Sequence, residues 1–431
     1  MIENREVLRR LREHAEQVDA GPETVERITG VVAGNAGRLA DALRELLGSF
    51  LDEQDHDGRD VTGLLLADVA GAAALPDLTM ADDRDLGDTP YHLRELIDQM
   101  LRAERPAARE ALLGMMTGGS VDQCRVALDW IGPVLTAADV PLLAACATRP
   151  EPEIRVLAVE AVPEPGTDDR AYQLLTGALR DTDGAVRLAA VSRLGEALRP
   201  ESVGPLATLT ADSDPRVRAR AAYALGRIGA ASGGRTGSAS VRGGPGSVAG
   251  ERGSGSVAAG GGSGSVAGGG GSGEAVLLAA LGVFLRDEDE RVRGRAGEAL
   301  GAIGGDPAVG VLLSEAVAAD PRQRVRAAKG LAYVVDDDPR AEPVIRGLAA
   351  DPDASVRAAV LSGLATVGDI TGRWSSLVDG LATDADVTVR HRVVGTVAHL
   401  HPYPRKVLNV LVSDPSGFVR EAAVTTLAKL R

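Results

Sequence analysis

Three histidines near the C-terminal end of the chain, His391, His399 and His401, form its only histidine cluster. Imidazole nitrogens bind zinc, but a site requires several such ligands to converge, commonly with a carboxylate. His391 and His399 are about two helical turns apart, whereas His401 falls in a proline-rich turn. These side chains are either metal ligands or ordinary surface and turn histidines. We expect the second and predict no metal site.

An acidic run at residues 53–60 resembles the start of a calcium-binding loop. Acids at the first, third and fifth positions and Gly58 at the sixth fit that loop. The twelfth position, which should hold a bidentate glutamate, is Leu64. A solvated acidic loop is the alternative to a cation site, and we predict no resident cofactor.

Signatures of other chemistry are missing from the sequence. It contains no His-Glu dipeptide, no P-loop and no nucleophile elbow. Its two cysteines, Cys124 and Cys146, fit a reduced compartment and exclude a disulfide framework or a cysteine-based zinc site. Ten aromatic residues among 431 and a formal charge of -14 disfavour a nucleic-acid groove. We therefore predict no nucleic-acid partner.

The most regular feature is an arginine that follows valine or isoleucine at intervals of 30–33 residues, with one interval of 75. A period of this size is typical of a solenoid repeat. The eight marked arginines are Arg155, Arg187, Arg218, Arg293, Arg326, Arg357, Arg390 and Arg420.

The residues around each marked arginine predict an amphipathic helix. The positions one before, three after and seven after the arginine are apolar or small, with Lys329 as the exception. Spacings of four place them on one helical face. Four Asp-Pro pairs, at residues 214, 320, 351 and 414, read as helix starts. A second apolar segment precedes each start, so the repeat is expected to be a pair of antiparallel helices.

A positive charge in the first turn of a helix opposes the helix dipole. Each marked arginine has an acidic residue four or six positions before it. We therefore predict that each arginine pairs with a cap carboxylate of its own or of an adjacent repeat, which would form a structural ladder. A row of ligand-binding arginines is the alternative.

The segment from Asp214 to Gly229, DPRVRARAAYALGRIG, resembles the HEAT-like repeat of the phycobilin-lyase type. The resemblance covers roughly residues 121–431. It implies an all-α, right-handed α-solenoid of stacked helix pairs of the HEAT or armadillo class. Such repeats occur in adaptors, in chaperone-like factors and in a few enzymes.

Two regions depart from the repeat. Residues 1–120 hold 24 acidic and 13 basic residues, and we expect an acidic helical cap or diverged repeats there. Residues 231–273 contain 18 glycines, and we predict a disordered Gly/Ser-rich insertion that loops out between repeats.

The sequence favours a non-catalytic scaffold or adaptor that binds a protein partner on the concave face of the solenoid. The candidate contacts lie on the unmarked helices: Arg346, Asp379, Arg405 and Asn409. The alternative is a HEAT-like lyase or isomerase acting on a tetrapyrrole or a modified side chain.

We also expect a monomeric cytoplasmic protein from a bacterium with a GC-rich genome, because the chain has few lysines and no apolar leader. The apolar run from Val61 to Leu75 is too short to span a membrane and contains Asp68. We therefore expect no membrane partner.

Overall fold

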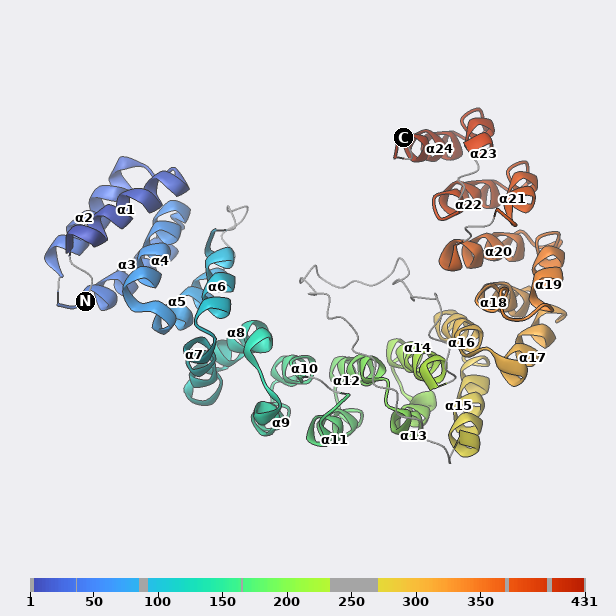
Figure 1. Cartoon of the computed structure of the whole chain (residues 1–431), viewed down its shortest axis with the longest axis horizontal. Coiled ribbons are helices and arrows are strands. Elements are labelled where there is room, and N and C mark those ends of the chain that lie inside the picture. Colours follow the sequence, from blue (N-terminus) through green and yellow to red (C-terminus); the bar gives the residue numbers. More distant parts are fainter. Residues whose placement is uncertain are drawn as a thin grey trace. The chain divides into compact units, whose positions relative to one another are not determined.

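The computed structural model describes residues 4–35, 37–84, 92–163, 166–232, 270–368, 372–400 and 405–429. These residues form helices and turns, and no strand occurs among them. The chain divides into two compact units, Met1–Arg193 and Leu194–Arg431. The helices of both units are stacked in consecutive antiparallel pairs (Figure 1).

The helices of the first unit are α1 Asn4–Val18, α2 Pro22–Gly34, α3 Leu39–Glu53, α4 His56–Ala70, α5 Leu75–Asp83, α6 His92–Ala103, α7 Arg105–Gly118, α8 Val121–Ile131, α9 Val140–Cys146, α10 Pro152–Glu160, α11 Asp169–Ala178 and α12 Gly184–Ala197, whose last residues belong to the second unit. Those of the second unit are α13 Val203–Ala207, α14 Pro215–Ser232, α15 Gly270–Phe284, α16 Glu290–Ile303, α17 Gly305–Ala316, α18 Pro321–Ala332, α19 Ala341–Leu348, α20 Ala354–Val367, α21 Ser375–Leu381, α22 Val387–Val397, α23 Arg405–Leu411 and α24 Gly417–Lys429.

The even-numbered helices from α10 onward are the second helices of their pairs, and they contain the marked arginines. Their predicted apolar face forms the core between the layers. In α20, for example, Val356, Val360 and Leu364 have no exposed surface. The same positions are buried in α14 and α22. The burial of this face stabilises each pair and its stacking on the next.

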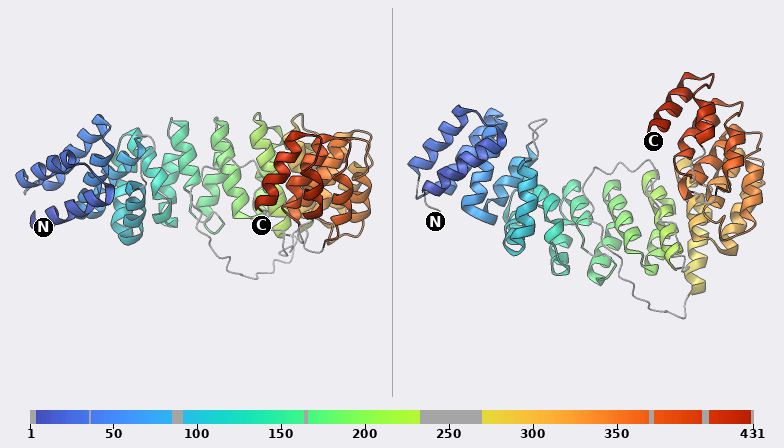
Figure 2. Two further views of the ribbon diagram at one scale, coloured as in Figure 1. Left: turned by 90° about the horizontal axis from the view of Figure 1, so that it is seen from above. Right: turned by 45° about the horizontal axis from the view of Figure 1, so that its top comes forward.

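Small residues bring the second helices of the second unit unusually close together. A methyl group added at Gly301 of α16 would overlap the carbonyl oxygen of Gly330 of α18, and one added at Gly226 would lie 2.7 Å from the Cα of Ala299. The first helices of neighbouring pairs make far fewer contacts with each other. Because one layer is packed more closely than the other, the second unit curves with its second helices on the inner side (Figures 1 and 2).

In the first unit, one helical stretch, His56–Asp83, is long and apolar enough to cross a membrane by length and composition. A helix in a protein core passes the same test, and 56% of its most apolar window is buried. Gly71, with a φ of 55°, separates α4 from α5. Arg59 and Asp60 form an ion pair in the interior of the unit.

The predicted Gly/Ser-rich insertion, residues 231–273, lies largely outside the described residues. The described residues at its two ends are helical, because α14 ends at Ser232 and α15 begins at Gly270. The boundary expected at residue 120 falls just before α8, and helix pairs occur on both sides of it.

Candidate functional site

An arginine–aspartate ladder joins successive repeats. In each rung an arginine of a second helix donates from Nε and Nη2 to both carboxylate oxygens of an aspartate in the next repeat, at 2.7–3.1 Å. The described pairs are Arg155 with Asp181, Arg218 with Asp287, Arg324 with Asp351, Arg357 with Asp384, and Arg390 with Asp414.

The same arginines also hold the turn before their own helix. Nη1 of Arg357 donates to the carbonyl oxygens of Asp351 and Pro352, at 2.7 and 3.1 Å. The equivalent carbonyl bonds occur at Arg187 and Arg420, whose carbonyl partners include Asp181 and Asp414 respectively. Each ladder arginine therefore connects two turns, and its bidentate geometry makes the contact strongly directional.

The ladder aspartates are not the helix caps. In the start of α20 the N-cap is Asp353, whose side chain accepts a hydrogen bond from the backbone of Ser355. Asp351, two residues earlier, is the ladder acceptor. Likewise, Asp414 is an acceptor, and α24 begins at Gly417. The prediction that the pairs at 351 and 414 start helices is wrong for this reason, whereas α14 and α18 do begin after Asp214 and Asp320.

The assignment of Arg326 to the ladder is also wrong. The ladder residue of α18 is Arg324, four positions after the N-cap Asp320, as in the other repeats. Arg326 is buried and binds Glu315 of α17, with Nε to Oε2 at 2.8 Å. Arg324 and Arg326 both fit the spacing of the repeats, and the Val-Arg pair identified Arg326 rather than the ladder residue Arg324.

This shift of two residues changes which face of α18 is exposed. Ala327 and Leu331 are buried, whereas the apolar face predicted from Arg326 consisted of Val325, Lys329 and Tyr333. Val325, Lys329 and Tyr333 remain partly exposed. The sequence signalled the shift, because Lys329 was the only charged residue at a predicted core position.

These side chains belong to a basic and aromatic surface on the inner side of the second unit, which we call the inner face. The guanidinium groups of Arg220 and Arg295 both lie over the ring of Tyr223 on α14, each 5.7 Å from the ring centre. Arg295 also donates to Glu298 at 2.8 Å. Burial, followed by the nearby charge of Glu298, raises the pKa of Tyr333 to about 12. Three adjacent second helices thus contribute to one cluster.

Charge is distributed unequally between the two layers. The helix α14 carries four arginines and no acidic residue, and α18 carries three arginines and Lys329 without an acidic residue. In the first helices α15 and α17, by contrast, every charged residue is acidic: Glu274, Asp306 and Glu315. The chain as a whole is negatively charged, but the inner layer of its second unit is therefore basic. Arg227 and Lys329 form no ion pair with any residue that the structure describes.

The predicted partner contacts lie on the opposite layer. Arg346 is on α19, where it binds Glu342 and stacks over Trp374. Asp379 and Asn409 are exposed on α21 and α23. Arg405 begins α23, and its side chain is outside the described set. These residues are not on the inner face, because α19, α21 and α23 form the outer layer of the second unit.

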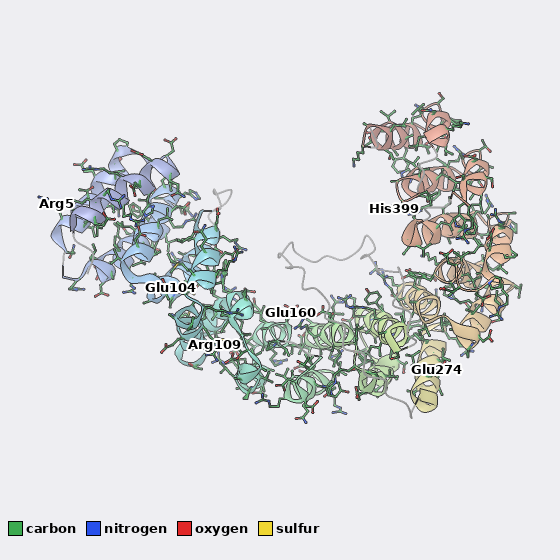
Figure 3. All side chains as sticks on the ribbon, in the orientation of Figure 1. Arg5, Glu104, Arg109, Glu160, Glu274 and His399 are labelled. Carbon is green, nitrogen blue, oxygen red and sulfur yellow. The ribbon has the colours of Figure 1, made fainter. Side chains whose placement is uncertain are left out.

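No group of three or more potential metal ligands occurs in the part of the chain that the structure describes. His391 stacks on Phe418 with ring centres 4.1 Å apart, and His399 is exposed after α22 (Figure 3); His401 lies outside the described residues. In the acidic run, Asp55 caps α4 by accepting from Gly58, and Asp60 is buried in its pair with Arg59.

The two cysteines are also poorly suited to covalent chemistry. Cys124 and Cys146 are free and buried. Burial, together with the neighbouring Cys124, raises the pKa of Cys146 to about 11. A thiol with so high a pKa is largely protonated at neutral pH and is a weak nucleophile.

A cleft of about 320 Å³ in the first unit is lined by residues of α3 and α5. Its charged side chains are paired with each other. Arg44 binds Asp77 at 2.7 Å and Arg84 binds Asp52 at 2.9 Å. The inner face of the second unit, where cationic side chains exceed acids, is the stronger candidate for binding.

The sequence matches the family of HEAT repeats over residues 173–234, 267–332 and 311–393. No curated protein matches it. Among solved structures, Kap95p bound to RanGDP is similar with a TM-score of 0.55 at 13% identity, covering 100% of this chain and 61% of that one. A Kap95:Nup1 complex gives 0.53 at 15% identity, with 100% and 61% coverage.

The chain therefore spans about three fifths of the length of these two proteins. At such low identity the likeness shows the fold, an all-α solenoid. The complex of CpcE and CpcF of phycocyanin lyase from Nostoc sp. PCC7120 is more distant, with a TM-score of 0.33 at 17% identity and coverage of 67% of this chain and 92% of that one.

Proposed function

Because this chain is a HEAT-repeat α-solenoid protein, we propose that it is a non-catalytic scaffold or adaptor that binds a protein partner on the inner face of its second unit. The observation that carries the proposal is the cluster of Tyr223 on α14, Arg295 on α16 and Tyr333, the residue that follows α18. Tyrosine and arginine are enriched at the energetic centres of protein interfaces. A surface that continues over several repeats suits an extended segment or a helix.

The structural neighbours with the higher TM-scores are complexes with protein partners, RanGDP and Nup1. They support a protein-binding role for this fold without identifying the partner of this chain. The alternative, a lyase or isomerase acting on a tetrapyrrole or a modified side chain, predicts a coloured or UV-absorbing ligand that copurifies with the protein.

The test is affinity capture from the native cell with the full chain as bait, followed by mass spectrometry. The wild type is compared with a double variant, Tyr223→Ala with Arg295→Gln, on the inner face. The matched control is Asp379→Asn with Asn409→Ala, two exposed positions of the outer layer. We expect the Tyr223→Ala and Arg295→Gln double variant to recover at least about tenfold less partner than the wild type. The control should recover as much partner as the wild type.

Loss of the partner in the outer variant alone would place the binding surface on α21 and α23 and would overturn the proposal. Recovery of no partner above background with the wild type would leave the scaffold role without support. Thermal denaturation of each bait establishes that both variants are folded.

A further inference from the structure

Among the described residues of the second unit, the ladder has one interruption. Each ladder acceptor lies two residues before the N-cap of a second helix: Asp287 before Asp289, Asp351 before Asp353, and Asp384 before Asp386. At α18 the N-cap is Asp320, and the residue two positions earlier is Ala318. The backbone of this turn is like that of the others, because the carbonyl of Ala318 accepts from Arg324 at 2.9 Å. Only the carboxylate is missing.

The interruption leaves Arg293 of α16 without its inter-repeat partner. Nη1 makes the usual bonds to the carbonyl oxygens of Asp287 and Glu288, at 2.6 and 2.9 Å. Nη2 contacts Glu290 of the same helix, which is 54% exposed. Nε, which donates to aspartate in the other rungs, has no acceptor among the described residues. The side chain of Arg293 is itself only 15% exposed, and Glu290 contacts just one of the two donors that bind aspartate in the complete rungs.

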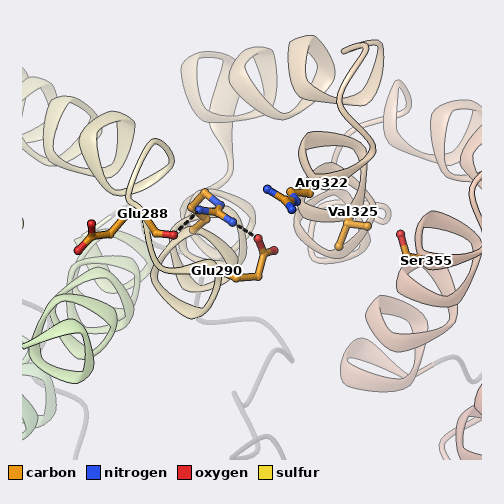
Figure 4. A pocket seen from close by; sticks show the side chains of 6 residues that line it. Glu288, Glu290, Arg322, Val325 and Ser355 are labelled. Atoms are coloured by element: carbon orange, nitrogen blue, oxygen red, sulfur yellow. Dashed lines mark hydrogen bonds and ion pairs between the residues drawn. The ribbon is translucent and has the colours of Figure 1, made fainter.

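A cleft of about 450 Å³ opens beside this arginine. Figure 4 shows its lining, in which Arg322 and Val325 come from α18 and Ser355 from α20. The remaining lining residues are Arg293, Glu290 and Glu288, and the side chain of Glu288 is 89% exposed. Arg322 forms no ion pair with a described residue. Two guanidinium groups therefore border the cleft. The two acids beside them are more than half exposed, with Glu290 in contact with Arg293 and Glu288 3.4 Å from Nη2 of Arg218.

The cleft is continuous with the inner face. Arg322, Val325 and Lys329 follow one another at spacings of three and four residues, which places them on one side of α18. A segment that begins in the cleft can therefore continue past Lys329 to Tyr333 and Arg295, where charge is also positive.

We propose that this cleft receives a carboxylate from an acidic segment of a protein partner, which occupies the place of the missing aspartate and bonds to Nε and Nη2 of Arg293. The proposal rests on the scaffold function and specifies the chemistry of its partner. A carboxylate is favoured over a phosphodiester because the chain itself fills the equivalent place with a carboxylate in every described rung. Arg322 and Lys329 supply the charge that attracts the rest of the segment.

The decisive variant is Ala318→Asp, which restores the missing rung from within the chain. Its carboxylate should bind Arg293 and compete with the ligand. The matched control is Ala319→Asp, which adds the same charge one residue away, at an exposed position that is not the acceptor. Thermal denaturation reports whether the restored rung holds, because Ala318→Asp should melt at or above the temperature of the wild type.

Binding is measured by fluorescence anisotropy on the full chain. The probe is a short fluorescein-labelled peptide of Asp, Glu, Gly and Ser, compared with its Asn/Gln counterpart and with a short single-stranded DNA. We expect the affinity for the acidic peptide to be at least about tenfold higher than that for the neutral peptide. Ala318→Asp should lower the affinity for the acidic peptide about tenfold. Ala319→Asp should change this affinity by about twofold or less.

Equal losses in the two variants would show a general charge effect and would overturn the proposal. So would absence of acidic-peptide binding, or DNA binding that is tighter and equally sensitive to Ala318→Asp. These outcomes leave the scaffold function standing if capture of the partner still depends on Tyr223 and Arg295. Capture that is indifferent to the inner face removes the scaffold proposal itself.

Discussion

Asp384 binds two arginines of two different repeats. Its carboxylate accepts from Nε of Arg357 at 2.7 Å, and its backbone carbonyl accepts from Nη1 of Arg390 at 2.8 Å. The carboxylate also accepts from the backbone N–H of Asp386, the N-cap of α22. The turn between α21 and α22 is thereby fixed to the preceding repeat and to its own second helix at once.

Replacement of Arg357 with Met should destabilise the second unit by about 2 kcal/mol. The change leaves Asp384 without its charged partner while 92% of that side chain stays buried, and it removes two bonds to backbone carbonyls. Chemical denaturation measures the effect. Arg392→Met in α22 is the control, because Arg392 is exposed and in no described ion pair. An unchanged denaturation midpoint in Arg357→Met would refute a stabilising role for the ladder.

The ladder should also make stability depend on pH in acid. The hydrogen bond from Arg357 lowers the pKa of Asp384 below its ordinary value of 3.8, and Arg324 and Arg390 have the same effect on Asp351 and Asp414. A carboxyl whose pKa is lower in the folded state stabilises that state fully above the unfolded pKa. This contribution is lost as the pH falls through the folded pKa.

Asp384→Asn should therefore be less stable than the wild type at neutral pH, and the difference should shrink below about pH 4. Denaturation of both proteins at a series of pH values tests this expectation. A difference that stays constant from neutral pH down to about pH 2 would mean that the charge of Asp384 is not what stabilises the turn.

The repeat architecture was predictable because its signals are local. The positions around each Val-Arg pair encode a helix with one apolar face, and this needs no knowledge of neighbours. Val356, Val360 and Leu364 are buried as their spacing predicts. The ladder could be anticipated in outline from the unfavourable charge in the first turn. The prediction that the acceptors are cap carboxylates is wrong, because acceptors such as Asp287 and Asp384 lie two residues before the caps Asp289 and Asp386.

The inner face was not predictable in the same way. Which layer is inner depends on how closely neighbouring helices approach, as at Gly301 and Gly330, and these glycines are 29 residues apart in the sequence. Arg346 and Asp379 were therefore predicted on the concave face, whereas their helices lie in the outer layer. The exposure of Lys329 and Tyr333 depends on a register shift in one repeat. A period of 31 or 33 residues fits Arg324 and Arg326 equally well.

Gly301→Ala should destabilise the second unit by about 1–3 kcal/mol, because the added methyl overlaps the backbone of Gly330 and the two helices must separate. Gly310→Ala in α17 is the matched control. A methyl at Gly310 meets no atom within 4 Å, so this change should be neutral or stabilising by up to about 1 kcal/mol. Similar effects of the two substitutions on the melting temperature would contradict the close approach of α16 and α18.

Lys329 should contribute to partner binding through its charge. It lies on the exposed side of α18 between Val325 and Tyr333, and it is in no described ion pair. Lys329→Met should weaken binding of the captured partner about three- to tenfold and should reduce the dependence of affinity on salt between about 50 and 500 mM. Lys406→Met is the control, because Lys406 is an exposed lysine of α23 in the outer layer. The affinity of both variants for the partner is measured across that salt range. An equal loss of affinity in both would show that binding depends on overall charge rather than on the inner face.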